Sequence, residues 1–270
     1  MNTAIKLALN GTYGKSNDKW SFFYDPKYTM SITINGQLLL AMLIEELAEL
    51  KDITVLQANT DGVTVKIPKE ELSKLQTICS DWEKLTQLEL ECNYYQKMVI
   101  RDVNNFIAQD VDGHIKDKGL AFEIDKAIYK NHSMRIVRIA LANYFINYVP
   151  IELTLRDHLL GNDYQIGTKK VKNHGIFDFC LSYKGNKDWS LVGKEEDKEY
   201  KYQKTNRYYI TNSGVNLFKN HSSDGRVIGL QVGWEATIFN KYVKQDTYDI
   251  NYDFYTKECQ KIIKSIENDN

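Results

Sequence analysis

The sequence predicts an α+β fold, in which helices cover one face of an antiparallel sheet. Residues 53–65 show the period of two that is typical of a β-hairpin, around a polar turn that ends in Gly. Leucines recur at helical spacing between residues 36 and 50, directly before that hairpin. Further short strands, separated by turn residues, follow between residues 87 and 118. Because strands joined by short turns pair antiparallel, this order of helices and hairpins indicates the α+β class.

The first helix is predicted over residues 1–15. Lys6, Asn10 and Tyr13 stand at positions i, i+4 and i+7, so a helix presents all three on one face. Gly14 is a suitable C-cap, which predicts the end of the helix. The three side chains suit a surface that faces a nucleotide, because Lys can neutralise a polyphosphate and Tyr can lie against a base pair. A short amphipathic helix with a Gly stop is the alternative that these residues leave open.

The predicted hairpin turn contains Asn59, Thr60 and Asp61. Asp61 places one carboxylate at the tip, where a rigid hairpin could hold a metal ligand for phosphoryl transfer. Asn, Asp and Gly also dominate hairpin turns for conformational reasons alone, so plain turn chemistry is the alternative.

The segments around the hairpin are predicted as follows. An irregular turn rich in aromatic residues precedes the leucine helix, and a helix from Pro68 to about Leu85 follows the hairpin. The turn covers residues 20–35, and the later strands cover 87–94, 97–103, 105–110 and 114–118. Lys116 and Lys118 alternate along the last strand, so both ammonium groups share one face. That face could contact a phosphate backbone, or the lysines could simply protect a sheet edge.

Residues 131–270 are predicted to form a mixed, largely helical region. Asn131 begins an N-cap for a long helix that ends near Pro150, and a terminal helix runs from about Asp253 to Glu267. The stretch between them is polar, tyrosine-rich and dense in charge. Its lysine clusters among aromatic residues could follow a nucleic-acid backbone, although most such runs are solvated faces.

Composition excludes several classes of protein. The net charge of −1 provides no global basic field, so any nucleic-acid binding must come from local patches. The four cysteines are scattered without a C-x-x-C pair, which indicates neither a zinc site nor a disulfide framework and favours a reducing cytoplasm. No signal peptide and no apolar run of membrane-spanning length is expected, so no membrane partner is predicted. The five histidines are far apart in the sequence and are predicted at the surface or at caps.

Two of these stretches, in this order and at this spacing, resemble the family B DNA polymerases of phages. Lys6-x-x-x-Asn10-Gly11-x-Tyr13-Gly14 is similar to the family's fingers-to-palm motif, usually Lys-x-x-x-Asn-Ser-x-Tyr-Gly. Asn59-Thr60-Asp61-Gly62 is similar to the palm hairpin, usually Asp-Thr-Asp-Ser. Two later segments also resemble the family: Arg101 to Phe106 with Lys116-x-Lys118-Gly119, like the palm segment that grips the primer end, and Arg207-Tyr208-Tyr209-Ile210, like a late Arg-Tyr-Tyr segment.

The resemblance implies a role for each matching residue. Lys6, Asn10 and Tyr13 would bind the incoming nucleotide, and Asp61 would be the catalytic ligand of two Mg²⁺ ions. Contacts to DNA are implied for Gly14, Asn59, Thr60, Asn104, Phe106, Lys116, Lys118, Arg207 and Tyr208. The implied domains are the end of the fingers helix at 1–15, an antiparallel-sheet palm at 16–130 and a thumb at 131–270.

The sequence also departs from the family pattern. Asn59 stands where the palm hairpin usually has its first Asp, and the upstream palm motif with the other metal-binding Asp has no counterpart before Lys6. We therefore expect the C-terminal part of a DNA-directed DNA polymerase, inactive alone. Its expected partners are primer–template DNA, deoxynucleoside triphosphates and the missing N-terminal polymerase part. A non-catalytic nucleic-acid-binding module on a degenerate palm is the alternative.

Overall fold

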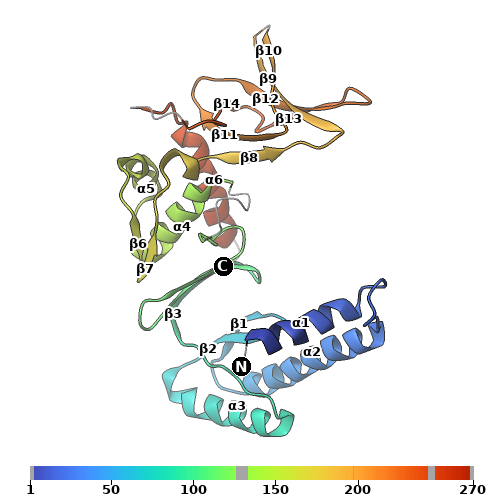
Figure 1. Ribbon diagram of the computed structural model, residues 1–270. Coiled ribbons are helices and arrows are strands. Elements are labelled where there is room, and N and C mark those ends of the chain that lie inside the picture. The colour runs from blue at the N-terminus through green and yellow to red at the C-terminus, as the bar shows by residue number, and fades with distance from the viewer. Residues whose placement is uncertain (1–2, 126–132, 197, 243–246, 268–270) are drawn as a thin grey trace. The chain divides into compact units, whose positions relative to one another are not determined.

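The computed structural model confirms the α+β class and describes residues 3–125, 133–196, 198–242 and 247–267 (Figure 1). These residues form six α-helices and several small antiparallel sheets. The chain divides into two compact units, Met1–Cys92 and Asn93–Asn270, and each is described by itself. The division of the chain into fingers, palm and thumb stays a prediction.

The first unit is built on a small apolar core between two helices and the predicted hairpin. Leu43 and Leu47 pack with Leu75 and Trp82, and the indole Nε1 of Trp82 donates to the carbonyl of Leu39 at 2.9 Å. The predicted first helix, hairpin and third helix are confirmed. The elements are α1 (Thr3–Ser16), α2 (Pro26–Ala48), β1 (Thr54–Ala58), β2 (Val63–Lys66), a 3-10 turn (Lys69–Glu71) and α3 (Leu72–Thr86).

Helix α2 begins ten residues before the predicted start at Gly36, so the irregular turn predicted over residues 20–35 is wrong from Pro26 onwards. The Asp25 carboxylate caps the helix by accepting the backbone N–H of Tyr28 at 3.0 Å, and Pro26 occupies the first turn. This longer helix is long and apolar enough to cross a membrane, so the expectation that the sequence has no apolar run of membrane-spanning length is wrong. Length and composition alone are weak evidence for a membrane span, and the absence of a membrane partner stays a prediction.

A three-stranded antiparallel sheet opens the second unit, in the order β3-β4-β5. Its strands are β3 (Tyr95–Asp102), β4 (Asn105–Asp110) and β5 (Ile115–Lys118). Ile107 is completely buried, and Val99 and Ile115 pack with it against the main core of the unit. The strand predicted at 87–94 is wrong, because this segment is irregular and the Leu90 N–H bonds to the Glu83 carboxylate at 2.7 Å instead of to a neighbouring strand.

The rest of the second unit mixes helices and strands, as predicted, but the prediction that it is largely helical is wrong. Among the residues described, three α-helices accompany nine strands, whose outward Lys, Asn and Tyr side chains gave them the composition of a solvated polar stretch. The predicted N-cap residues Asn131 and His132 lie outside the described residues. The helices are α4 (Arg135–Asn147), α5 (Ile151–Asp157) and α6 (Tyr252–Glu267). The strands are β6 (Tyr164–Ile166), β7 (Lys169–Val171), β8 (Leu181–Lys184), β9 (Trp189–Glu195), β10 (Lys198–Lys201), β11 (Thr205–Thr211), β12 (Asn216–His221), β13 (Val227–Leu230) and β14 (Glu235–Ile238).

Two histidines converge on one buried carboxylate. His158 is the C-cap of α5 and His174 is the N-cap of the 3-10 turn Gly175–Asp178, so both stand at caps, as the sequence predicts. His158 is completely buried, and its Nε2 lies 3.0 Å from Oδ2 of Asp178. Arg135 at the start of α4 donates to Oδ1 of Asp178 at 2.9 Å, and the backbone N–H of His174 donates to Oδ2 at 2.9 Å. The His158 ring also stacks on Tyr164, with its Nδ1 3.0 Å from the phenol oxygen. This network joins α4 to the loops and strands that follow it.

Candidate functional site

Helix α1 presents the predicted nucleotide-binding face to the outside. Every residue from Thr3 to Lys15 is exposed, and the helix is continuous, so Lys6, Asn10 and Tyr13 share one side. The Tyr13 phenol lies 2.9 Å from the Thr33 hydroxyl of α2, which fixes the ring at the contact of the two helices.

Gly14 does not end α1, so its prediction as a C-cap is wrong. The helix continues to Ser16, whose hydroxyl donates to the carbonyl of Tyr13 at 2.6 Å and lies 2.6 Å from the hydroxyl of Thr29. The contact with Thr29 ties the last turn of α1 to α2. No atom lies within 4 Å of the position of a side chain at Gly14, so a partner could approach the backbone there.

The β1–β2 turn holds the predicted metal ligand at an exposed tip. Oδ1 of Asn59 accepts the backbone N–H of Asp61 at 2.9 Å, and the N–H of Asn59 donates to the carbonyl of Gly62 at 3.0 Å. The Asn59 side chain therefore stabilises the turn, in the way Asn does in many turns. Thr60 and the carboxylate of Asp61 are exposed.

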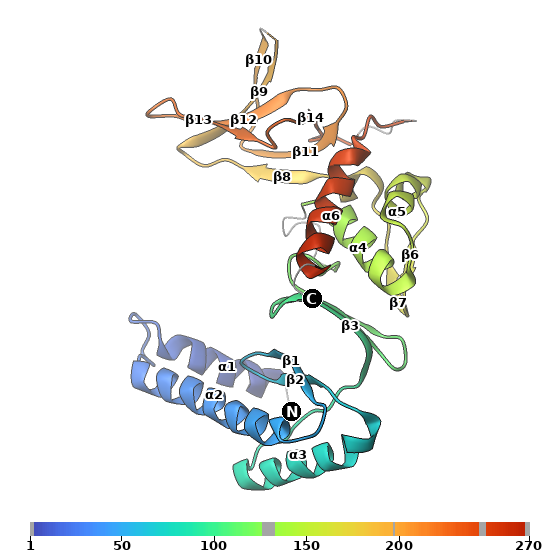
Figure 2. The same ribbon diagram turned by 180° about the vertical axis from the view of Figure 1, so that it is seen from behind.

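Helix α1 and the hairpin belong to the same compact unit. Both ribbon views draw the beginning of α1 beside the β1–β2 hairpin (Figures 1 and 2). A cationic side chain near a carboxylate-bearing turn is suited to polyphosphate chemistry, in which an ammonium group balances phosphate charge and a carboxylate holds a metal ion. Asp61 supplies one protein carboxylate, whereas two metal ions about 3.5–4 Å apart need several carboxylates to hold them.

Lys116 and Lys118 are both exposed on one face of β5, as the alternation predicts. Their antiparallel partners on β4 are Ala108 and Phe106. Phe106 is only 6% exposed, so its ring packs inside the protein and is not presented for stacking. Asn104 is exposed in the β3–β4 turn, where its backbone N–H donates to Asp102 at 2.9 Å.

Arg207 and Tyr208 occupy very different environments on β11. Tyr208 is 3% exposed and belongs to the main core, and burial raises the pKa of its phenol. The Arg207 guanidinium is half-buried, with its Cζ 5.9 Å from the ring centre of Phe177. Of this pair, only Arg207 has a side chain within reach of a ligand at the surface, and the DNA contacts of both residues stay predictions.

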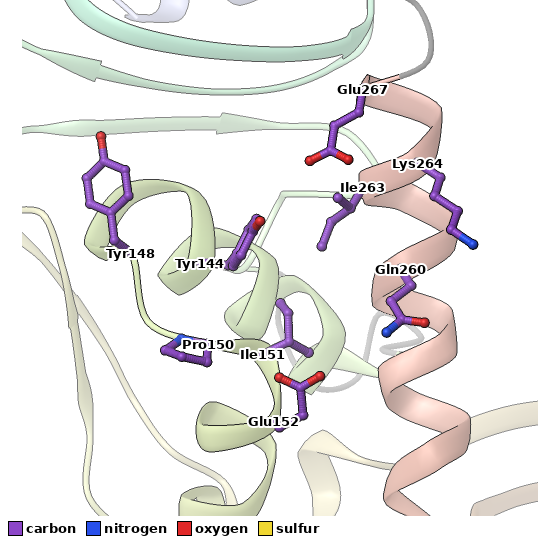
Figure 3. A pocket seen from close by; sticks show the side chains of 9 residues that line it. All are labelled: Tyr144, Tyr148, Pro150, Ile151, Glu152, Gln260, Ile263, Lys264 and Glu267. Atoms are coloured by element: carbon purple, nitrogen blue, oxygen red, sulfur yellow. The ribbon is translucent and has the colours of Figure 1, made fainter.

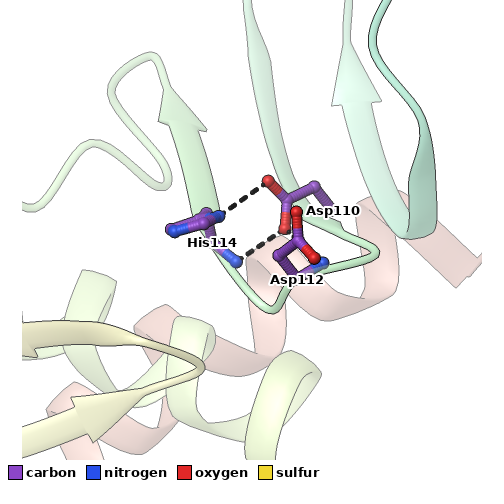
Figure 4. Close-up of side chains that lie close together, drawn as sticks. All are labelled: Asp110, Asp112 and His114. Atoms are coloured by element: carbon purple, nitrogen blue, oxygen red, sulfur yellow. Dashed lines mark hydrogen bonds and ion pairs between the residues drawn. The ribbon is translucent and has the colours of Figure 1, made fainter.

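The β4–β5 turn brings together three groups that the sequence did not single out as a set. One ligand atom each of Asp110, Asp112 and His114 lies within 4.8 Å of the others (Figure 4). Asp110 caps the turn: its Oδ1 accepts the N–H groups of Asp112 at 2.9 Å and His114 at 2.7 Å. Burial raises the pKa of Asp110, but these hydrogen bonds outweigh it and hold the pKa below its usual value. The turn geometry thus accounts for this group, which lies in the second unit and does not include Asp61.

A hollow of about 530 Å³ lies between α4, α5 and α6 (Figure 3). Tyr144, Ile151 and Ile263 give it apolar walls, and Glu152 and Glu267 add acidic groups. None of the residues predicted to bind nucleotide, metal or DNA lines this hollow.

Comparisons with known proteins add no relative. No family model matches the sequence, and no curated protein matches it either. The candidate site therefore rests on the residues and on their positions in the two units.

Proposed function

We propose that this chain is the C-terminal part of a DNA-directed DNA polymerase, covering the end of the fingers, the palm and the thumb, and that it adds nucleotides to a primer together with the N-terminal polymerase part. The observation that carries the proposal is the combination, within one compact unit, of an exposed Lys6–Asn10–Tyr13 face and an exposed Asp61 at a hairpin tip. Lys6 would neutralise the triphosphate, Asn10 would orient it, and Tyr13 would pack beside the new base pair.

The magnesium site is only partly supplied by the residues described. Asp61 fits the role of a metal ligand, because its carboxylate is exposed and its turn is fixed by Asn59. Oδ1 of Asn59 is engaged in the turn, so the tip offers one carboxylate. The remaining carboxylates would come from the N-terminal polymerase part, because one carboxylate cannot hold two metal ions.

A non-catalytic nucleic-acid-binding module is the second candidate. The single carboxylate at the hairpin tip favours it, because a binding module needs no metal pair. Both candidates use Lys116 and Lys118 on β5 for phosphate contacts, so they differ in catalysis and not in DNA binding.

DNA binding is tested by fluorescence anisotropy on a labelled primer–template over a salt series. We expect weak binding that falls steeply with salt, because phosphate contacts release counterions. The double variant Lys116→Ala/Lys118→Ala should lower the slope of log K against log salt by about two. The matched control Lys74→Ala/Lys84→Ala removes two exposed lysines of α3 and should leave that slope unchanged. Absent or salt-independent binding contradicts both candidates.

Catalysis is tested by offering Mg²⁺ and deoxynucleoside triphosphates to the same complex. We expect no extension by the chain alone and templated extension when the N-terminal polymerase part is added. Asp61→Asn should abolish that extension without changing DNA affinity, since Asn keeps the turn but not the charge. Extension at a normal rate by the Asp61→Asn variant would contradict the metal-ligand assignment. A complemented wild-type complex that binds DNA without extending it would favour the binding module.

A further inference from the structure

The polar and apolar sides of α2 are reversed relative to an ordinary surface helix. In its first half the partly covered residues face α1 and are small or hydroxylic, namely Pro26, Thr29, Thr33 and Gly36. Outward residues are instead apolar: Met30 is 61% exposed, Ile34 45% and Leu38 61%. An apolar surface of this extent indicates a partner that covers it.

One outward stripe of α2 has a symmetrical sequence. Its members follow one another by steps of four and three residues, so they share one side of the helix, and all of them are exposed. They are Lys27, Ser31, Ile34, Leu38, Ala41 and Glu45. The stripe lies roughly 140° around the helix from the residues that face α1. Its two central residues, Ile34 and Leu38, are apolar, and Ser31 and Ala41 on either side of them are small. Its end residues, Lys27 and Glu45, carry opposite charges, and no other residue of α2 between these two is charged.

We propose that this stripe is the contact between two copies of the chain, with their α2 helices antiparallel about a twofold axis that crosses the stripe midway between Ile34 and Leu38. In this pairing Ile34 meets Leu38 of the partner subunit, Ser31 meets Ala41 of the partner subunit, and Lys27 meets Glu45 of the partner subunit. The twofold axis makes each contact twice. A parallel pairing would place like charges together at both ends, so the stripe is complementary to itself only when antiparallel.

Several observations favour a second copy over an anionic lipid surface. The small side chains of Ser31 and Ala41 leave room for close approach of two helices on either side of the apolar centre. The rings of Trp20 and Phe22, which precede α2 in the chain, are also exposed and add apolar area to the first unit; stable interfaces bury on the order of 800 Å² per partner. Opposite charges at the two ends suit a copy of the same helix better than an anionic lipid surface, which would repel Glu45.

Sedimentation equilibrium over a concentration series tests the contact. The wild-type chain should sediment as a dimer, at twice its 31.4 kDa. Ile34→Lys/Leu38→Lys places four ammonium groups at the centre of the contact and should give a monomer. The matched control Ile32→Lys changes a 42% exposed residue on another side of α2 and should remain dimeric. Far-ultraviolet circular dichroism checks that each variant keeps its helices.

A charge exchange tests the antiparallel register. Lys27→Glu and Glu45→Lys should each weaken self-association about tenfold, because each replaces two attractive pairs with two repulsive ones. An equimolar mixture of the two variants should form a heterodimer of wild-type strength, since every Glu then faces a Lys. Failure of the mixture to associate would overturn the register. A wild-type chain that stays monomeric would overturn the proposal, also where it binds vesicles of anionic phospholipid or a different protein.

Discussion

The Asp178 carboxylate contacts Arg135, His158 and His174, which come from different parts of the second unit. The Asp178 and Arg135 side chains are only 3% and 4% exposed. Burial raises the pKa of Asp178, but the hydrogen bond from His158 and the charge of Arg135 outweigh it and lower the pKa to about 2. The carboxylate is therefore ionised throughout the neutral range, and the buried guanidinium depends on it.

Asp178→Asn should destabilise the second unit by about 3–5 kcal/mol, because it leaves the buried Arg135 charge without its partner. Urea denaturation followed by tryptophan fluorescence measures the loss. Asp224→Asn is the matched control, since it removes a carboxylate that faces Arg226 at 2.6 Å but is 41% exposed. The control should change stability much less than Asp178→Asn does, because solvent screens an exposed ion pair. Equal losses of stability in the two variants would contradict the expectation that a buried ion pair matters more than an exposed one.

The same carboxylate predicts how stability depends on pH. Its pKa in the folded state lies below the ordinary value of 3.8, so its stabilising contribution is complete above that value and is lost as the pH falls through about 2. The contribution is about 2 kcal/mol. The stability difference between wild type and Asp178→Asn should therefore narrow between about pH 5 and pH 2. A stability difference that stays constant over this pH range would contradict the lowered pKa of Asp178.

At the scale of elements, the C-cap of helix α3 is a residue type that rarely adopts the backbone conformation found there. This C-cap, Gln87, has a left-handed conformation with φ of 58°. Glycine is the usual residue there, because a side chain crowds the backbone at positive φ. The Gln87 side chain offsets part of this cost by donating to the carbonyl of Lys84 at 2.6 Å.

Gln87→Gly should be more stable than Gln87→Ala by about 1 kcal/mol, since both lose the side-chain hydrogen bond and only Gly suits positive φ. Position Thr77, an exposed residue inside α3, is the matched control. There the order should reverse, with Thr77→Ala more stable than Thr77→Gly by about 1 kcal/mol. Thermal denaturation of the four variants provides the comparison, and the same order at both positions would contradict the assigned conformation.

At the scale of the whole molecule, the two units have cores of very different size. Four buried residues form the core of the first unit, Leu43, Leu47, Leu75 and Trp82. The core of the second unit contains 31 buried residues among those described. Because stability rises with the apolar surface that a core buries, the first unit should unfold before the second.

Calorimetry should therefore show two transitions, and one core variant should shift each of them. Leu75→Ala should lower only the first transition and Leu155→Ala only the second, each by about 2–5 kcal/mol of unfolding free energy. These leucines are 7% and 0% exposed, so both substitutions remove buried methyl groups. A single transition that both variants lower together would contradict the division into two independent units.

The sequence alone was sufficient wherever the signal is local. The hairpin that carries Asp61, helix α3 and helix α6 all formed where they were predicted, because a turn, a cap or a 3.6-residue period depends on neighbours in the chain. The alternation of Lys116 and Lys118 on one exposed face also followed from the two-residue period of a strand.

Only the tertiary structure decided which residues meet and which are covered. Arg135, His158, His174 and Asp178 converge although they are spread over more than forty positions, and no local pattern announces such a contact. The family resemblance implies DNA contacts for Phe106 and Tyr208, yet packing buries both side chains. Burial depends on the elements that fold over a residue, and those elements come from distant parts of the chain, so period and composition could not predict it.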